Sequence, residues 1–218
     1  MNNKIITSPP LSGKENMLAD IEALKKAEDQ CLLRFFQWDN KTITLGNNEK
    51  AERSINLEYV TKSDIQLVRR PTGGRAVFHF SNNSEVTFSL VCPRKNSLFQ
   101  DNLHDAFHWV SSLVISALPK EERILQHQGK EKQSGNSCFD SLSRYEISYN
   151  NHKFFGSAQK RTQSHLLVQS TLLLKGHREF SEVFNNGGEF HGVADIFPEI
   201  SRELVISAIK KKFQDYMN

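Results

Sequence analysis

Segments with the apolar spacing of amphipathic helices alternate in this sequence with groups of short, strand-like segments. The spacing predicts helices over residues 16–27, 103–118 and 201–217. Short or alternating apolar runs bounded by turn residues predict strands over 31–38, 42–45, 65–69, 85–92, 145–149, 153–158 and 166–174. Strands that follow one another in groups favour antiparallel pairing over regular strand–helix–strand alternation. The order therefore predicts an α+β fold with a largely antiparallel or mixed central sheet flanked by helices.

One domain over residues 1–218 is expected, because the chain shows no internal repeat, linker or low-complexity segment. Residues 1–12 carry no apolar period and are predicted to form a loose tail. In segment 85–92 the apolar residues fall on one face, which predicts a half-buried strand. Ser201 is expected to cap the last helix. The inward residues of that helix are predicted to be Leu204, Val205, Ala208, Ile209 and Phe213.

Composition excludes several classes of protein. Hydrophobic residues make up 38% of the chain and charged residues 24%, as in ordinary globular proteins. The net charge of +3, from 28 basic and 25 acidic residues, is too small to indicate nucleic acid binding. No apolar run is long enough to span a membrane, and the first ten residues lack the apolar core of a signal peptide. Three cysteines without disulfide-like spacing favour the reducing cytoplasm.

The first candidate site is the segment Arg69-Arg70-Pro71-Thr72-Gly73-Gly74-Arg75-Ala76-Val77-Phe78-His79. A glycine pair lets the backbone approach a ligand closely and present N–H groups to an anion. The flanking arginines, with Lys160 and Arg161 further along, form either a solvated basic face or a site for phosphate or an acidic carrier protein.

The second candidate is Cys138, which follows the polar, glycine-containing loop Ser134–Ser137. Cys31 and Cys92 lie on apolar strands, where a cysteine is usually buried and inert. A thiol in a polar loop near cationic groups is better placed to ionise and act as a nucleophile. A structural role for Cys138 is the alternative.

The third candidate is the segment Lys153–Gln159. Lys153 opens a strand of aromatic and small residues. It is either an edge lysine that reaches solvent or a cation that orients a carbonyl and lowers the pKa of a nearby thiol. The small side chains of Gly156, Ser157 and Ala158 would let a long ligand lie against the backbone. The eight histidines are scattered without zinc-ligand spacing, so no metal is expected.

In this order and spacing, the three segments resemble the catalytic domain shared by lipoate-protein ligases, biotin protein ligases and octanoyltransferases. Residues 69–79 are similar to the family's RRxxGG-x-AV-x-H signature, and Asn16-Met17 and the segment Lys153–Gln159 also fit. Cys138-Phe139-Asp140 followed by Tyr145-Glu146 is similar to the cysteine-dependent octanoyltransferase branch. The resemblance implies the catalytic-domain fold of lipoate and biotin ligases.

For this chain, the resemblance implies that Cys138 takes an octanoyl group from acyl carrier protein as a thioester. A lysine on a lipoyl domain of a 2-oxoacid dehydrogenase, or on the glycine cleavage H protein, would then accept it. No cofactor would be needed. Lys153 would contact the acyl carbonyl as a second catalytic residue, and a general-base role for His79 is one hypothesis. The implied substrate-binding residues are Arg70, Thr72, Gly73, Gly74, Arg75, His79, Gly156, Ser157 and Ala158.

Two residues depart from the family pattern. Phe80 stands where Asp commonly follows the motif histidine, and Gln169 stands where relatives often have His. Three alternatives to octanoyl transfer therefore stay open. They are an ATP- and Mg-dependent lipoate ligase that forms an acyl-adenylate, an amidotransferase that moves acyl groups between lipoyl domains, and a carrier-binding module without catalysis.

Overall fold

The computed structural model describes residues 3–95, 102–120, 124–126, 146–149, 152–185 and 190–217. Its helices and strands follow one another in the order β1 (Lys4–Leu11), α1 (Gly13–Lys25), β2 (Leu32–Trp38), β3 (Thr42–Leu45), α2 (Ala51–Ser54), α3 (Leu57–Lys62), β4 (Gln66–Arg69), β5 (Val77–His79), β6 (Glu85–Pro93), α4 (Leu103–Ile115), β7 (Ile124–Gln126), β8 (Ile147–Tyr149), β9 (His152–Arg161), β10 (His165–Leu173), α5 (Glu179–Val183), α6 (Val193–Ile196) and α7 (Arg202–Met217).

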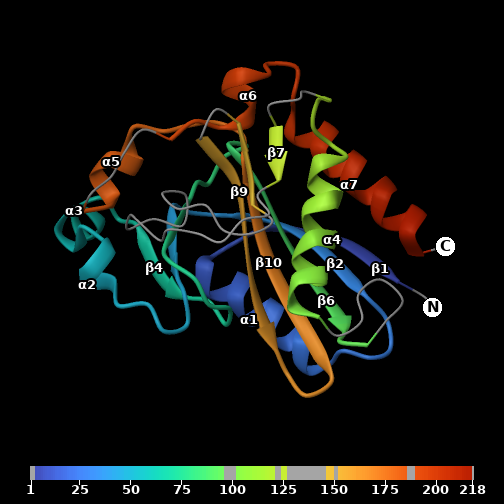
Figure 1. The fold of residues 1–218 in the computed structure, drawn as a ribbon. Helices are drawn as coiled ribbons and strands as arrows, with labels where there is room; N and C mark the ends of the chain where they lie inside the picture. Colours follow the sequence, from blue (N-terminus) through green and yellow to red (C-terminus); the bar gives the residue numbers. More distant parts are fainter. Residues whose placement is uncertain are drawn as a thin grey trace.

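The strands form two sheets, which are visible in Figure 1. The larger sheet has the order β1-β2-β6-β10-β9-β8-β7, and its neighbouring strands are antiparallel except for the parallel pair β1–β2. The smaller sheet has the order β4-β3-β5, with β3 parallel to β4 and antiparallel to β5. The predicted mixed sheet flanked by helices is confirmed.

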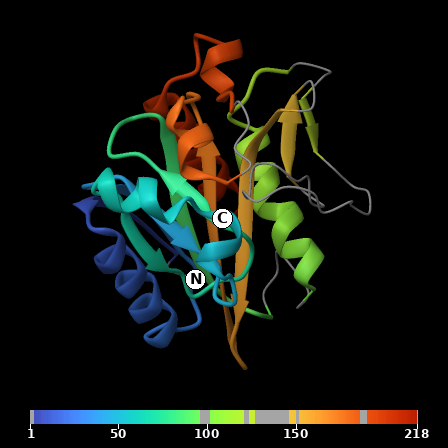
Figure 2. The ribbon, with the colours of Figure 1, turned by 90° about the vertical axis from the view of Figure 1, so that its left-hand side faces the viewer.

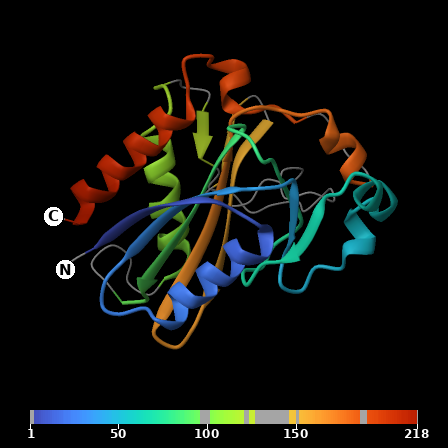
Figure 3. The same ribbon diagram turned by 180° about the vertical axis from the view of Figure 1, so that it is seen from behind.

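Helices cover both faces of the larger sheet. Figure 2 shows α1 on one side of this sheet and α4 on the other, and α7 packs beside α4. The main core lies on the α4 and α7 side, where Phe88, Val110 and Ile209 are buried together. Helix α1 contacts strands of both sheets, and Figure 3 shows it crossing the back of the molecule where they meet. This junction positions the candidate site.

Strand β6 is buried on both faces, whereas the sequence pattern predicts a half-buried strand. All of residues 85–92 are buried. Strand β6 lies between β2 and β10, with α7 on one face and α1 on the other. Its second face carries Thr87 and Ser89 beside Glu85, and the two hydroxyl groups donate inside the protein, Thr87 to Glu85 and Ser89 to Asp20. Polar residues on a strand therefore did not mean a solvent-exposed face.

The predicted loose tail over residues 1–12 is wrong, because residues 4–11 form strand β1. This strand pairs in parallel with β2, with a register shift between Thr7 and Pro10. Its side chains are mostly exposed, so the strand is held by backbone hydrogen bonds to β2 and has no apolar pattern. Proline at the shift suits an edge strand. Proline has no backbone N–H, and on the outer side of an edge strand no neighbouring strand would accept one.

Two predictions for the last helix have different outcomes. Ser201 Oγ accepts a hydrogen bond from the Leu204 backbone N–H, as expected of a cap. The predicted inward position of Leu204 is wrong, because its side chain is 45% exposed while Val205 and Ile209 are fully buried. Leu204 lies at the edge of the apolar stripe. None of the described helices combines the length and apolar character that a membrane span requires.

Phe80 belongs to the core of the smaller sheet. It packs against Phe78 and Phe180 with ring centroids 4.5 and 5.4 Å apart, and it stacks on His177 at 3.8 Å. A carboxylate at this position would be buried among aromatic rings without a compensating charge. At Phe80, where the chain departs from the family pattern, the surrounding aromatic rings therefore suit phenylalanine better than aspartate.

Cys31 and Cys92 lie opposite each other at the end of the β2–β6 pair and form a disulfide, across 61 residues of sequence. The sequence spacing gave no sign of this pairing. The expectation of three reduced thiols is wrong for these two residues, because the antiparallel register alone brings them together.

We expect the denatured, unreduced protein to react with one equivalent of maleimide and the reduced protein with three, counted by intact mass. The single reactive thiol would be Cys138. Reduction should also lower the free energy of unfolding by roughly 3 kcal/mol, because the cross-link restricts the unfolded chain. Three equivalents without reductant would contradict the disulfide.

Candidate active site

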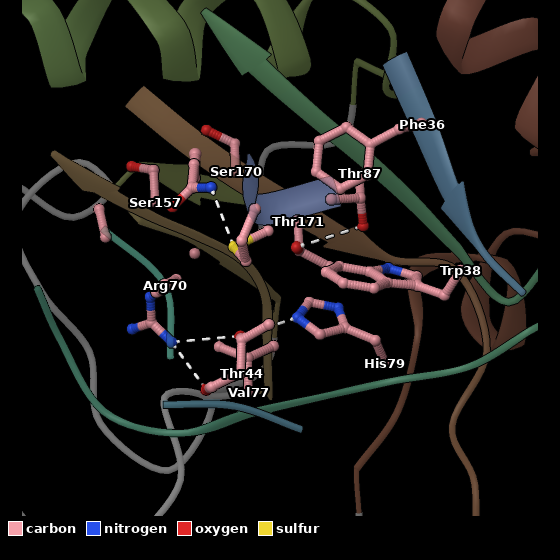
Figure 4. Close-up of a pocket in the computed structure, with 14 residues that line it drawn as sticks. Phe36, Trp38, Thr44, Arg70, Val77, His79, Thr87, Ser157, Ser170 and Thr171 are labelled. Atoms are coloured by element: carbon pink, nitrogen blue, oxygen red, sulfur yellow. Dashed lines mark hydrogen bonds between the residues drawn. The ribbon is translucent and has the colours of Figure 1, made fainter. Parts of the chain in front are cut away.

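A cavity opens where the two sheets meet, with a volume of about 440 Å³ including its open mouth. Helix α1, strands β2, β6, β9 and β10 of the larger sheet, and the smaller sheet all contribute to its wall (Figure 4). The residues that line it are Met17, Phe36, Trp38, Thr44, Arg70, Val77, His79, Thr87, Gly156, Ser157, Ala158, Gln169, Ser170 and Thr171. Aromatic, aliphatic and thioether side chains form much of this wall, which suits an apolar ligand.

Arg70 fastens the loop that follows β4, and Arg69 fastens the neighbouring segment that follows β3. Arg70 is 5% exposed, and its guanidinium donates to the carbonyl oxygens of Thr44, Gly73 and Arg75 at 2.6 to 3.1 Å. Figure 4 shows the bonds from Arg70 to Thr44. Arg69 donates to the carbonyls of Gly46, Asn47 and Glu49. The two arginines thus bind backbone of their own protein, and the loop is held in one shape.

The glycines of this loop have different structural needs. Gly74 has φ of +89°, which disfavours any residue with a β-carbon. Gly46, on the neighbouring turn, lies so close that a β-carbon there would be 1.8 Å from the Gly74 carbonyl oxygen. Around Gly73, by contrast, a β-carbon would meet nothing within 4 Å.

We expect Gly46→Ala to lower the free energy of unfolding by about 2 kcal/mol, because the added methyl group must displace the backbone of Gly74. Gly73→Ala is the matched control, and its effect should stay within about 0.5 kcal/mol. Urea denaturation of both variants measures the difference. Equal losses in the two variants would contradict this packing.

His79 is held by hydrogen bonds at both ring nitrogens. Its Nδ1 lies 3.0 Å from Glu85 Oε1, and its Nε2 lies 3.0 Å from Thr44 Oγ1. The ring stacks on Trp38 with centroids 4.1 Å apart, and Trp38 Nε1 donates to the same Glu85 oxygen. All of these residues are buried. His79 is therefore fixed as a wall of the cavity and as a support for Thr44.

Lys153 on β9 and Glu146, the residue just before β8, form a buried ion pair. The two charged groups lie 2.5 Å apart, and their side chains are 1% and 7% exposed. Lys153 is three residues before Gly156, the first cavity residue of β9. The predicted alternative of a solvent-reaching edge lysine is wrong, because the side chain is buried. Because both groups are withdrawn from water, their charges interact more strongly than they would at the protein surface.

The structure brings Arg70, His79, Gly156, Ser157 and Ala158 of the predicted set into one cavity wall. Thr72 contacts this wall through Gln169, and a β-carbon on Gly74 would lie 4.0 Å from the β-carbon of Ala158. Gly73 and Arg75 take part through their carbonyls, which accept from Arg70. Cys138 and its flanking loop lie outside the described residues.

Three buried charged residues near the cavity were not predicted from the sequence. Asp20 pairs with Arg34 at 2.9 Å, and Glu85 accepts from Trp38 and Thr87. Burial raises the pKa of Asp20, although Arg34 and the hydrogen bonds to the carboxylate oppose that rise. Arg34 interrupts the largely apolar strand β2, and this was the available signal.

Comparison with known proteins identifies the family. The profile of the lipoyl protein ligase A/B catalytic domain matches residues 13–217. The chain belongs to this family. Among the described residues, no group of three His, Cys, Asp or Glu side chains is arranged to hold a metal ion.

Two bacterial members of the family, both named octanoyltransferase LipM, are among the similar curated proteins. The Clostridioides difficile protein is 29% identical over 78% of this chain and 65% of its own length. The Moorella thermoacetica protein is 34% identical over 65% of this chain and 53% of its own length. The chain therefore spans between about half and two thirds of the length of these curated relatives.

Solved structures of the family share the fold. A lipoate-protein ligase A bound with ATP has a TM-score of 0.77, with 20% identity and coverage of 100% of this chain and 86% of that chain. LipL1 of P. falciparum in complex with lipoate has a TM-score of 0.74, with 17% identity and coverage of 99% and 62%. The catalytic-domain fold that the resemblance implied is thus confirmed.

Proposed function

We propose that this protein is an octanoyltransferase. It would move an octanoyl group from acyl carrier protein, through a thioester on Cys138, to a lysine of a lipoyl-accepting protein. The observation that carries the proposal is the similarity to bacterial octanoyltransferases at 29% and 34% identity. The largely apolar cavity at the junction of the two sheets supports it, because an alkyl chain buried there loses its contact with water.

The reaction takes two acyl transfers. The Cys138 thiolate attacks the carbonyl carbon of the octanoyl thioester, the bond to the carrier sulfur breaks, and the carrier thiolate leaves. The neutral ε-amine of the acceptor lysine then attacks the enzyme thioester. An amide bond forms, the bond to the Cys138 sulfur breaks, and the proton lost by the amine passes to the departing thiolate or to water. The first step exchanges one thioester for another, and the stability of the amide drives the second step, so neither ATP nor another cofactor is required.

Within this proposal, Lys153 stabilises the negative charge that develops on the carbonyl oxygen and favours the thiolate form of Cys138. The cavity wall formed by Met17, Phe36 and Trp38 holds the alkyl chain. The acceptors would be lipoyl domains of 2-oxoacid dehydrogenases or the glycine cleavage H protein. A carrier-protein donor would place the reaction in the cytoplasm.

An ATP-dependent ligase would need cationic groups that bind the phosphate of an acyl-adenylate. Arg70, the glycine loop and Lys153 are the groups that would suit this phosphate. The Arg70 guanidinium, however, donates to three carbonyl oxygens of the surrounding backbone, and phosphate binding would have to displace some of these bonds. The hydrogen bonds of Arg70 therefore favour acyl transfer over adenylation.

The proposal is tested by incubating the protein with octanoyl-acyl carrier protein in the absence of ATP and measuring its intact mass. We expect one octanoyl adduct per chain, which disappears when a lipoyl domain is added. A protein that remains unmodified with this donor but acylates the lipoyl domain from free octanoate and ATP would be a ligase. Octanoyl-lipoyl domain as an alternative donor distinguishes amidotransfer.

A further inference from the structure

A chain of four buried polar side chains runs from the larger sheet to the glycine loop. Arg34 on β2 donates to Asp20 on α1 at 2.9 Å, and Asp20 accepts from Gln169 Nε2 on β10 at 2.7 Å. Gln169 Oε1 then accepts from the hydroxyl of Thr72 at 2.7 Å. The four residues are between 0% and 8% exposed. Hydrogen bonds shielded from water to this degree are seldom exchanged for bonds to solvent.

The carboxylate of Asp20 sets the direction of the Gln169 amide. An ionised carboxylate only accepts, so the amide must turn its NH₂ group toward Asp20 and its oxygen toward Thr72. Asp20 is itself held by Arg34 and by the hydroxyl of Ser89, which donates at 2.7 Å. Arg34 also donates to Asn16 Oδ1 at 2.7 Å. Buried partners therefore determine both the position and the orientation of Gln169 Oε1, the oxygen that accepts from Thr72.

Thr72 lies between two anchors. On one side, Arg70 holds the carbonyls of Gly73 and Arg75 from the smaller sheet. On the other side, Gln169 holds the Thr72 side chain from the larger sheet. Gln169 also lines the cavity, and its amide nitrogen lies 3.4 Å from the Met17 sulfur, which lines the cavity as well. The loop position and the cavity wall are thus connected through one side chain.

We propose that Gln169, held by the Asp20–Arg34 pair, positions the Thr72–Gly74 loop beside the acyl cavity and so controls how tightly the acyl chain is bound. Gln169 and Asp20 are positioning residues in this view. They act through Thr72 and the cavity wall and take no part in bond making. The proposal rests on the octanoyltransferase function proposed above. It also gives a role to Gln169, where relatives often have His.

The main test compares Thr72→Val with Thr72→Ser. Valine keeps the branched shape but removes the hydroxyl donor, whereas serine keeps the donor. Losing one buried hydrogen bond corresponds to about a five- to tenfold change in an equilibrium. We therefore expect Thr72→Val to raise KM for the octanoyl donor about five- to tenfold while kcat changes less than about twofold. Thr72→Ser should restore a KM close to that of the unaltered protein.

A second variant approaches the same link from β10. Gln169→Leu removes both the bond to Thr72 and the bond to Asp20, and Asp20 keeps Arg34 and Ser89 as partners. We expect the same rise in KM, together with faster hydrogen exchange of backbone amides in residues 70–76. The positioning role is overturned if, in both variants, the amides of residues 70–76 exchange hydrogen at the rate of the unaltered protein and KM for the donor is unchanged. This holds whatever their melting temperatures.

A binding measurement separates this proposal from the octanoyltransferase proposal. The chain has two tryptophans, and Trp38 lies in the cavity wall while Trp109 lies in the core beside α7. In a Trp109→Phe background, Trp38 fluorescence reports the binding of octanoate. A protein that forms no adduct but binds octanoate more weakly after Thr72→Val would contradict the transferase proposal and support the positioning role. If the protein forms the adduct but Thr72→Val leaves octanoate binding unchanged, the transferase proposal is supported and the positioning role is contradicted.

Discussion

Replacing Cys138 with serine is expected to abolish the octanoyl adduct and to lower the rate of transfer at least about 1,000-fold. The physical reason is that a serine hydroxyl ionises at far higher pH than a thiol, so the attacking anion is almost absent at neutral pH. An oxygen ester formed on serine would also be a poorer acyl donor to an amine than a thioester. Removing a nucleophile typically costs this much or more.

The measurement is transfer from octanoyl-acyl carrier protein to a lipoyl domain, followed by intact mass of both proteins. A double variant, Cys31→Ala with Cys92→Ala, is the control for a general effect of removing thiols. It removes the disulfide and should lose stability, but it should still form the adduct at low temperature. An adduct that survives Cys138→Ser would sink the proposed nucleophile.

Replacing Lys153 with methionine is expected to have two effects that can be separated. It removes a buried cation, which should lower the acylation rate about 100-fold or more if the ammonium stabilises the developing oxyanion. It also removes the cation from the buried ion pair with Glu146, which should lower the free energy of unfolding by roughly 3–5 kcal/mol.

The double variant Lys153→Met with Glu146→Gln resolves these effects, because it removes both charges. We expect most of the lost stability to return and the lost activity to stay lost. Glu146→Gln alone, which keeps the cation, serves as the matched control. The rates are measured as single-turnover acylation of Cys138 at saturating donor, and stability by thermal melting. If activity returns together with stability in the double variant, Lys153 has a structural role and no role in catalysis.

Much of the fold was predictable because local patterns agree with the tertiary arrangement. The strand expected over 42–45 has those bounds in the structure, the one over 31–38 differs from β2 by one residue at its start, and the one over 166–174 differs from β10 by one residue at each end. Strand β1 was missed because backbone bonds to β2 hold it, and such bonds leave no side-chain pattern. The double burial of β6 was missed because its polar face is covered by α1.

The candidate site was predicted only in part. The glycine loop and the strand containing Gly156 were found from their motifs, and the cavity brings Arg70, His79 and Ala158 together. That Arg70 binds a ligand stays a prediction, and nothing in the sequence indicated that its guanidinium holds the carbonyls of Thr44 and Arg75. Short-range patterns indicate which residues are unusual, but they do not say which partner each side chain will find.

The sequence by itself determined the fold class, the order of the main elements, the family and the residues worth testing, because periodicity and motif spacing are properties of neighbouring residues. Only the tertiary structure decided which distant groups meet. Cys31 faces Cys92, Lys153 faces Glu146, and Asp20 links Arg34 to Gln169. These partners are joined by strand register and by the packing of α1 against strands of both sheets, and the strength of each contact comes from its burial.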